Sequence, residues 1–212
     1  MKKGLFITIE GPDGSGKTTQ SKLLVEYLKK KGYSVVHTRE PGGTSLAEFL
    51  REVILNPDLK IAPVTELLLY SASRAQHTIE LIKPSLQERK IVVCERYTGA
   101  TIAYQGYGRG LDIELIKKLN RIATGGLTPD LTIILDVPVE KGLRRIKKGR
   151  NHDRLEKESL EFHRRVRQGY LALAKESPEK IKVVSSSDNI DLTHKRIVKV
   201  VEKYLKKYRA DN

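Results

Sequence analysis

The chain has 212 residues, of which 39% are hydrophobic and 31% are charged, and its formal net charge is +14 at pH 7. This composition is typical of one globular domain with a hydrophobic core, and no apolar stretch approaches the roughly 20 residues that a membrane-spanning helix needs. The single cysteine, Cys94, excludes an intramolecular disulfide framework and a multi-cysteine metal site, and it favours a cytoplasmic location.

Five short apolar runs predict β-strands, and segments with helical periodicity separate them. We expect strands at residues 5–10, 34–40, 91–97, 131–137 and 182–186. We expect helices at residues 18–31, 45–55, 65–86, 111–124, 156–176 and 192–208. Strands that are apolar almost throughout and alternate with helices predict an α/β fold, in which helices cover both faces of a five-stranded parallel sheet. No internal repeat or linker interrupts the pattern, so residues 1–212 are expected to form a single domain.

The strongest motif lies between the first predicted strand and the first predicted helix. Residues 11–18 read GPDGSGKT and match the P-loop pattern G-x-x-x-x-G-K-[ST] in full. Glycines let the backbone close around phosphates with its N–H groups inward, and the helix N-terminus adds a partial positive charge. In such a loop the lysine reaches the β- and γ-phosphates, and the hydroxyl, here that of Thr18, holds Mg²⁺. The residues expected to bind a nucleoside triphosphate are Gly11, Pro12, Asp13, Gly14, Ser15, Gly16, Lys17, Thr18 and Thr19.

Other candidate ligand-binding residues follow the later predicted strands. REPGGT occupies residues 39–44, Glu95-Arg96-Tyr97 ends the third strand, and Asp136 lies near the end of the fourth. Ligands bind outside the carboxyl ends of the strands in a doubly wound sheet, so we expect these motifs to face one crevice with the P-loop. Arginines bind phosphate oxygens and aromatic rings stack on bases, which predicts a nucleotide acceptor opposite the triphosphate. The residues that would supply these groups are Arg39, Arg51, Arg74, Arg96, Tyr70, Tyr104 and Gln105.

Taken together, these motifs resemble the thymidylate kinases of the bacterial type, which are P-loop nucleoside monophosphate kinases. The similarity runs from Phe6 to the last predicted helix, and REPGGT together with AYQG at residues 103–106 is its most specific part. The resemblance implies phosphoryl transfer from ATP to dTMP with Mg²⁺, giving dTDP and ADP in dTTP synthesis. It also implies a homodimer, formed by helices that lie away from the crevice.

The resemblance assigns roles to several positions in the acceptor site. Tyr70 would stack on thymine, and Arg74 would read the edge of the base. Arg51 and Arg96 would hold the acceptor phosphate. Tyr104 would pack near C2′ of the sugar and disfavour a ribose hydroxyl.

Further assignments concern the two charges of REPGGT and the residues around AYQG. Glu40 would lie near the acceptor sugar, whereas Arg39 is expected to be structural and held in an ion pair. Gln105 would approach the base or phosphate, Thr101 would keep one hydroxyl for the base edge, and Asp13 would orient the partners of the acceptor phosphate.

The sequence departs from the family pattern at two positions. Glu95 stands where the family usually has aspartate, and its extra methylene changes its reach. Ala100 stands in a pair that is usually polar, so only Thr101 of that pair keeps a hydroxyl. Both departures concern the thymine side of the site rather than the parts needed for phosphoryl transfer.

A further positive charge should reach the transferring phosphoryl group, and the P-loop contains no arginine. The basic segment at about residues 142–156 is predicted to be a short mobile lid that supplies this charge. Arg150 and Arg154 are expected to do so in preference to Arg145. The expected catalytic residues are therefore Lys17, Asp13, Arg96, Arg150 and Arg154.

Three alternatives remain at this point. Another nucleoside monophosphate kinase would share these motifs and differ in its acceptor base. A switch GTPase would need an N-K-x-D motif after a late strand, where residues 184–188 read VSSSD. The basic last third of the chain is compatible with a nucleic-acid-binding ATPase, but such a protein needs stacking aromatics along a basic groove and only 6% of the residues are aromatic. Neither nucleic acid nor a membrane is therefore expected as a partner.

Overall fold

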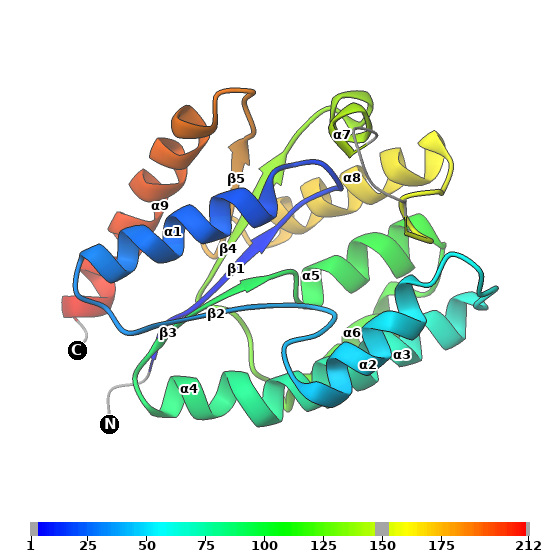
Figure 1. The fold of residues 1–212 in the computed structure, drawn as a ribbon, viewed down its shortest axis with the longest axis horizontal. Helices are drawn as coiled ribbons and strands as arrows, with labels where there is room; N and C mark the ends of the chain where they lie inside the picture. The colour runs from blue at the N-terminus through cyan, green and yellow to red at the C-terminus, as the bar shows by residue number, and fades with distance from the viewer. Residues whose placement is uncertain (1–3, 147–152, 211–212) are drawn as a thin grey trace.

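A single parallel sheet forms the centre of the computed structural model, which describes residues 4–146 and 153–210. Its strands are β1 (Phe6–Glu10), β2 (Val35–Arg39), β3 (Ile91–Glu95), β4 (Leu131–Asp136) and β5 (Ile181–Ser185). Their order across the sheet is β2-β3-β1-β4-β5, and all neighbours are parallel. The predicted α/β fold with five parallel strands is confirmed. The strand order places the loop after β1 at the middle of the edge where the carboxyl ends of the strands meet (Figure 1).

Helices connect the strands, and their positions largely follow the predicted periodicity. They are α1 (Lys17–Lys30), α2 (Ser45–Leu55), α3 (Pro63–His77), α4 (Lys83–Gln87), α5 (Thr98–Thr101), α6 (Ile113–Thr124), α7 (Val139–Ile146), α8 (Leu160–Glu176) and α9 (Ile190–Ala210). Two π-helical turns, η1 (Thr78–Ile82) and η2 (Ile102–Gly108), join some of them. The helix predicted at residues 65–86 is thus three consecutive elements, α3, η1 and α4.

The described helices form two layers, one on each face of the sheet. Successive side chains of a strand point to opposite faces, and apolar side chains on both faces need to be covered. Ile7 and Ile9 of β1 pack with Leu24 of α1 and Val201 of α9 on one face. Phe6, the neighbour of Ile7, packs on the other face with residues of η1, α4 and β3. A third cluster joins side chains of α3, η2, α6 and α8 to Ile134 of β4. Burial on both faces explains why the strands are apolar almost throughout.

The segment α5–η2 was not predicted as helical. It contains three glycines, and two of them are required by close packing. A Cβ added to Gly108 would lie 2.6 Å from the ring of Phe162 on α8, and one added to Gly106 would meet Ile113 at the start of α6. These glycines therefore let η2 approach α6 and α8 closely, which brings the residues of AYQG to the sheet edge.

No helix within residues 4–146 and 153–210 is both long and apolar enough to cross a membrane. The expected lid at about residues 142–156 begins within α7 and ends in a turn after residue 152. Residues 147–152, including Arg150, lie outside the described part of the chain.

Candidate active site

A cavity of about 690 Å³ lies at the carboxyl ends of the strands. The P-loop lines one side, and residues that follow β2 and β3 line the other. The predicted site residues that line it are Asp13, Gly14, Ser15, Gly16, Lys17, Thr18, Thr19, Glu40, Arg51, Tyr70, Arg74, Arg96, Thr101, Tyr104 and Gln105. The expected triphosphate and acceptor sites therefore share one cavity. Gly11 and Pro12 lie in the loop without lining it.

Lys17 lies at the bottom of the P-loop, where its amine folds back on the loop. Its Nζ donates to the carbonyl oxygens of Pro12 at 2.8 Å and Gly11 at 3.1 Å. Burial, together with the positive charge of Arg96, lowers the pKa of Lys17 to about 7. Among the described residues, no side chain caps the N-terminus of α1, whose N-cap Gly16 has φ 90°. The free N–H groups at this helix end and the lysine amine form a site suited to polyphosphate.

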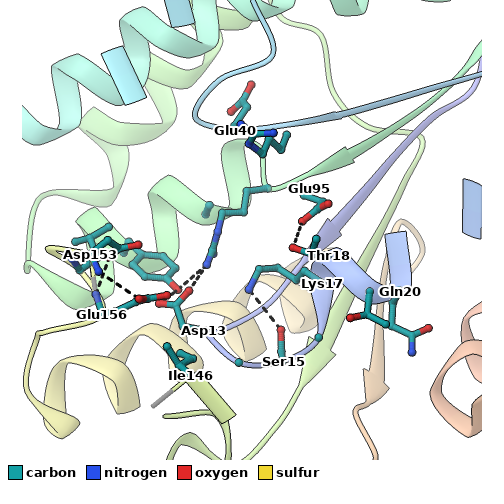
Figure 2. Close-up of a pocket in the computed structure, with 18 of the residues that line it drawn as sticks. Asp13, Ser15, Lys17, Thr18, Gln20, Glu40, Glu95, Ile146, Asp153 and Glu156 are labelled. Carbon is teal, nitrogen blue, oxygen red and sulfur yellow. Dashed lines mark hydrogen bonds and ion pairs between the residues drawn. The ribbon is translucent and has the colours of Figure 1, made fainter. Parts of the chain in front are cut away.

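Thr18 is joined to Glu95 across the base of the cavity (Figure 2). The threonine hydroxyl donates to Oε2 of Glu95 at 2.7 Å, while Oε1 accepts from Ser21 at 2.7 Å and lies 3.1 Å from Nε2 of His37. Burial raises the pKa of Glu95, but the hydrogen bonds from His37, Thr18 and Ser21 outweigh it and lower the pKa to about 2. The methylene that distinguishes Glu95 from aspartate thus lets one carboxylate reach both α1 and β2.

Arg96 lies between the P-loop and the acceptor side. Its guanidinium forms an ion pair with Asp13, donates to the carbonyl oxygen of Gly11 at 3.2 Å and to the hydroxyl of Tyr104 at 3.1 Å. The Tyr104 hydroxyl in turn donates to Oδ2 of Asp13 at 2.7 Å. Burial tends to raise the pKa of Asp13, but the charges of Arg96 and Lys17 hold it below its usual range.

The backbone of Arg96 has φ 65°, a left-handed conformation that costs a non-glycine residue about 1–3 kcal/mol. The contacts of its side chain with the P-loop offset this cost.

Arg74 is almost fully enclosed, with 1% of its surface exposed. Nε donates to Glu40 at 2.8 Å, Nη1 donates to Thr101 and Asn120 at 2.7 Å each, and Nη2 donates to the carbonyl oxygen of Tyr97 at 2.9 Å. Arginine has five N–H donors, and four are used by these protein groups. Arg74 therefore retains one N–H for a ligand, in a direction that its buried partners determine.

The two charged residues of REPGGT have different environments. Arg39 forms the expected ion pair, with Glu48 at 3.0 Å; the pair is about half exposed, and Arg39 also lines the cavity. Glu40 is buried, and its two oxygens contact Arg74 and Nδ1 of His77, the latter at 3.0 Å. Glu40 borders the cavity and also fixes the orientation of Arg74.

Arg51 and Tyr70 form the outer wall of the acceptor side. Arg51, on α2, is half-buried and donates to the carbonyl oxygen of Pro41 at 2.9 Å. Tyr70, on α3, is half-buried, and burial raises the pKa of its hydroxyl, which therefore stays protonated. A planar ring and a guanidinium are thus available beside Arg96 for a base and a phosphate.

Gln105 and Arg154 meet at a second buried carboxylate, that of Glu66 on α3. Glu66 accepts from Gln105 at 2.7 Å, from Arg109 at 3.0 Å and from Arg154 at 2.5 Å. Arg154 also donates from Nε to the carbonyl oxygen of Ile54. In contrast to the expectation that Arg154 acts on the phosphates, its guanidinium is directed toward α2 and α3, and it does not line the cavity.

Arg145 contacts the P-loop, although Arg150 and Arg154 are the residues expected from the sequence to reach the phosphates. Nη1 donates to the carbonyl oxygen of Gly14 at 3.0 Å and to the hydroxyl of Ser186 at 3.2 Å. Nη2 donates to the carbonyl oxygen of Ser187 at 3.1 Å and to Asp188 at 2.8 Å. The loop between β5 and α9, which the motifs did not indicate, is thereby part of the site.

Three acidic residues complete the comparison with the predicted site. Asp153 and Glu156, which were assigned no role, line the cavity at the end of the lid segment (Figure 2). Asp136 does not line it, and Arg167 of α8 binds its two oxygens at 2.7 and 2.9 Å. Of the acidic residues that end strands, Glu95 of β3 therefore lines the cavity, whereas Asp136 of β4 is bound by α8.

Comparisons with known proteins agree with this geometry. The model of the thymidylate kinase family matches residues 9–197. Thymidylate kinase of Pelotomaculum thermopropionicum is 49% identical over 99% of this chain and 98% of its own length, and that of a Synechococcus species is 52% identical over 93% and 94%. The crystal structure of thymidylate kinase from Ehrlichia chaffeensis has a TM-score of 0.78 and 41% identity, covering 94% of this chain and 98% of its own. The chain therefore belongs to the thymidylate kinase family.

Proposed function

We propose that the chain transfers the γ-phosphoryl group of ATP to dTMP, giving dTDP and ADP for dTTP synthesis. The observation that carries the proposal is the shared cavity, in which the P-loop faces Arg96, Arg51 and Tyr70. A phosphate-binding loop alone would suit any nucleotide hydrolase. A second set of phosphate- and base-binding groups in the same cavity suits transfer between two nucleotides.

On the donor side, the N–H groups at the start of α1 and the amine of Lys17 would hold the polyphosphate. A bound polyphosphate would take the place of the loop carbonyl oxygens as partner of Lys17 and restore its positive charge. Arg145 is placed to fix the P-loop against the loop at residues 186–188, and so to shape the space for the donor base.

The residues present fit Mg²⁺ beside Thr18. The Thr18 hydroxyl gives its proton to Glu95, so its oxygen lone pairs stay free for a cation. Within residues 4–146 and 153–210 no cluster of three histidine, cysteine or acidic residues would form a closed metal cage. Mg²⁺ at nucleotide sites is usually bound by one or two protein oxygens together with water and substrate phosphates, so it does not need such a cage. When bound there, Mg²⁺ would supply charge neutralisation to the donor phosphates.

On the acceptor side, Arg96 and Arg51 would hold the phosphate of dTMP. The contact between Arg96 and Asp13 would keep the accepting phosphate close to the P-loop, which is what in-line transfer requires. Tyr70 would stack on thymine, and Arg74 would offer its remaining N–H to the base edge. Tyr104 would pack against the sugar.

The remaining acceptor and lid assignments follow from their surroundings. Thr101 and Gln105 are bonded to Arg74 and Glu66, so they would shape the base pocket together with those partners. Arg154 would reach the transferring group only after it leaves Glu66. The role of Arg150 in closing the site remains a proposal from the sequence.

Exposed apolar side chains support a homodimer as the working form. They lie on α2, α3 and α6, which pack side by side away from the P-loop (Figure 1). These side chains are 44–76% exposed, and they are Leu46, Phe49, Val64, Leu68, Leu115 and Ile122. A monomer rarely leaves large apolar residues exposed on adjacent helices without a partner, and a second copy of the chain would cover them.

The test is ATP/Mg²⁺ turnover with a panel of acceptors: dTMP, dUMP, UMP, dCMP, dGMP and AMP, with an acceptor-free blank and a DNA control. We expect ADP release to require dTMP, to fall with dUMP and to stay near the blank with the others. A missing methyl costs about 1–3 kcal/mol in an apolar pocket, so the preference over dUMP will be graded. A higher rate with another monophosphate would refute the thymine assignment, and a rate raised only by DNA would refute the acceptor site.

A further inference from the structure

We propose that Glu10 and Tyr170 are positioning residues for Arg96, and that they hold its guanidinium against the P-loop through one chain of hydrogen bonds. The proposal rests on the acceptor-phosphate role proposed for Arg96. Neither Glu10 nor Tyr170 lines the cavity. Both would therefore act on the reaction only through Arg96.

Glu10 is the last residue of β1 and is 1% exposed. Its Oε1 accepts from the backbone N–H of Tyr97 at 2.8 Å, and its Oε2 accepts from the hydroxyl of Tyr170 at 3.1 Å. In the described part of the chain no lysine or arginine forms an ion pair with it. A buried carboxylate without a direct counter-ion is costly, and its two oxygens serve here only as acceptors.

The bond to Tyr97 controls the backbone next to Arg96. Arg96 is in the left-handed region at φ 65°, and its own N–H donates to the carbonyl oxygen of Ile9 at 3.0 Å. The two residues that follow β3, Arg96 and Tyr97, therefore both donate their backbone N–H groups to acceptors at the end of β1. Glu10 supplies the second of these acceptors and so stabilises the conformation that points Arg96 toward the P-loop.

The bond to Tyr170 controls the side chain of Arg96. The Tyr170 hydroxyl gives its proton to Glu10 and accepts from Nη1 of Arg96 at 3.1 Å. As long as Glu10 is an acceptor, the lone pairs of the hydroxyl face the guanidinium. A donor in place of Oε2 would reverse the bond to Glu10, and the hydroxyl proton would lose the acceptor that directs it away from Arg96. Arg96 would lose one of the groups that hold it beside Asp13.

Protonation of Glu10 has the same effect as such a donor. Burial raises its pKa to about 7, even though Arg96, Arg74, the Tyr97 N–H and the Tyr170 hydroxyl act in the opposite direction. The other ionisable groups that interact with Glu10 are Lys17 in the P-loop and Cys94 on β3. As the pH falls through about 7, Glu10 gains a proton and the chain of hydrogen bonds reverses. The positioning of Arg96 should therefore be lost on the acid side.

The experiment compares the full-length wild type with Glu10→Gln and Tyr170→Phe in steady-state turnover with dTMP and ATP between pH 5.5 and 9. Glutamine places an amide donor against Tyr170, and phenylalanine removes the hydroxyl. We expect kcat/KM for dTMP to fall about 10- to 100-fold at pH 8.5 in both variants, while KM for ATP changes less than about twofold. Tyr27→Phe is the matched control, because Tyr27 also donates to a glutamate, Glu202, far from the cavity.

The pH profile distinguishes positioning from a general loss of structure. We expect the ratio of wild-type to Glu10→Gln kcat/KM to be largest above pH 8 and to approach one below about pH 6, where the wild type carries the proton itself. The ionisation of dTMP is common to both proteins and cancels in this ratio. A ratio that is constant with pH, or equal losses for dTMP and ATP, would refute the proposal. If Glu10→Gln does not fold, Tyr170→Phe alone tests the proposal: a loss of kcat/KM for dTMP with an unchanged KM for ATP supports it, and no such loss refutes it. Failure of the proposed function would look different, since the wild type itself would then show no turnover with dTMP.

Discussion

Arg154 donates from Nη1 to Oε2 of Glu66 at 2.5 Å, although the two residues are 88 positions apart. Glu66 is fully buried, and Arg154 is 10% exposed. The same carboxylate binds Gln105 and Arg109. One acidic residue on α3 therefore holds together η2 of the acceptor side and the segment that ends the expected lid.

Replacing Glu66 with glutamine should destabilise the protein by roughly 3 kcal/mol, because two arginines lose a buried counter-charge. Glu48→Gln is the matched control: its pair with Arg39 is about half exposed, so the loss should stay below about 1 kcal/mol. Urea denaturation of both variants measures the difference. If both variants lost the same free energy of unfolding, burial of the Glu66 ion pairs would not be the source of their stabilisation.

The effect of Glu66 should also depend on pH. Burial acts to raise its pKa, but Arg109, Gln105 and Arg154 outweigh burial and lower it below the ordinary value of 4.5. A lowered pKa means that the stabilisation is present above pH 4.5 and is lost as the pH falls below it. The difference in unfolding free energy between the wild type and Glu66→Gln should therefore shrink in acid. A difference that stays constant down to pH 3 would show that the charge of Glu66 is not its source.

Arg96→Lys should reduce kcat/KM for dTMP at least about 100-fold. The ammonium group of lysine cannot make the separate contacts that the Arg96 guanidinium makes with Asp13 and Gly11 and would make with a phosphate. Arg89→Lys is a matched control, since Arg89 also has a left-handed backbone, with φ 60°, but is exposed and outside the cavity. Steady-state kinetics with both variants provide the measurement. Similar losses in the two would indicate a backbone effect instead of a role in binding phosphate.

ATP binding should take up a proton at Lys17. The ligand-free pKa of about 7 leaves this amine mostly neutral at pH 8, and polyphosphate will raise the pKa again. Binding at pH 8 should therefore take up roughly one proton, which calorimetry in two buffers of different ionisation enthalpy detects. Lys17→Met should abolish most of the uptake, whereas Lys22→Met, on the same helix but exposed, should retain it. Undiminished uptake in Lys17→Met would assign the proton to another group.

Phe49→Arg should convert the proposed dimer into a monomer, because a charge would be placed among the exposed apolar side chains of α2, α3 and α6. Light scattering coupled to size-exclusion chromatography gives the mass directly. Leu192→Arg tests the same change at an apolar residue of α9 that is 42% exposed, and it should leave the mass unchanged. A monomeric wild type, or a dimer that survives Phe49→Arg, would exclude this surface as the interface.

The order of the elements could be predicted because it depends on local patterns. The apolar runs mark strands that are buried on both faces, and the P-loop motif marks the turn between β1 and α1. The segment α5–η2 was missed because Gly106 and Gly108 are typical of loops. Glycine is needed at these two positions because the ring of Phe162 and the side chain of Ile113 leave no room for a Cβ, and no local sequence pattern reveals these contacts.

The cavity itself was predictable, but the partners of individual charged side chains were not. A residue at the end of a strand is expected at the edge of the sheet where the cavity lies. Asp136 has such a position, yet it forms an ion pair with Arg167 of α8 and does not line the cavity. In the basic segment, Asp188 and the P-loop carbonyl bind Arg145, whereas Glu66 binds Arg154. Long-range ion pairs decide which arginine faces the ligand, and their members are far apart in the chain.

Gly142 of α7 lies directly against Gly14 of the P-loop. A methyl group on Gly142 would meet the carbonyl oxygen of Asp13 at 2.5 Å, and one on Gly14 would meet the backbone of Gly142. Replacing a helical glycine with alanine commonly raises stability by up to about 1 kcal/mol, and Gly142 would be an obvious choice in an effort to make the protein more heat-resistant. Here the same change would push α7 off the phosphate-binding loop, so alanine at position 142 would disturb the P-loop instead of stabilising the protein.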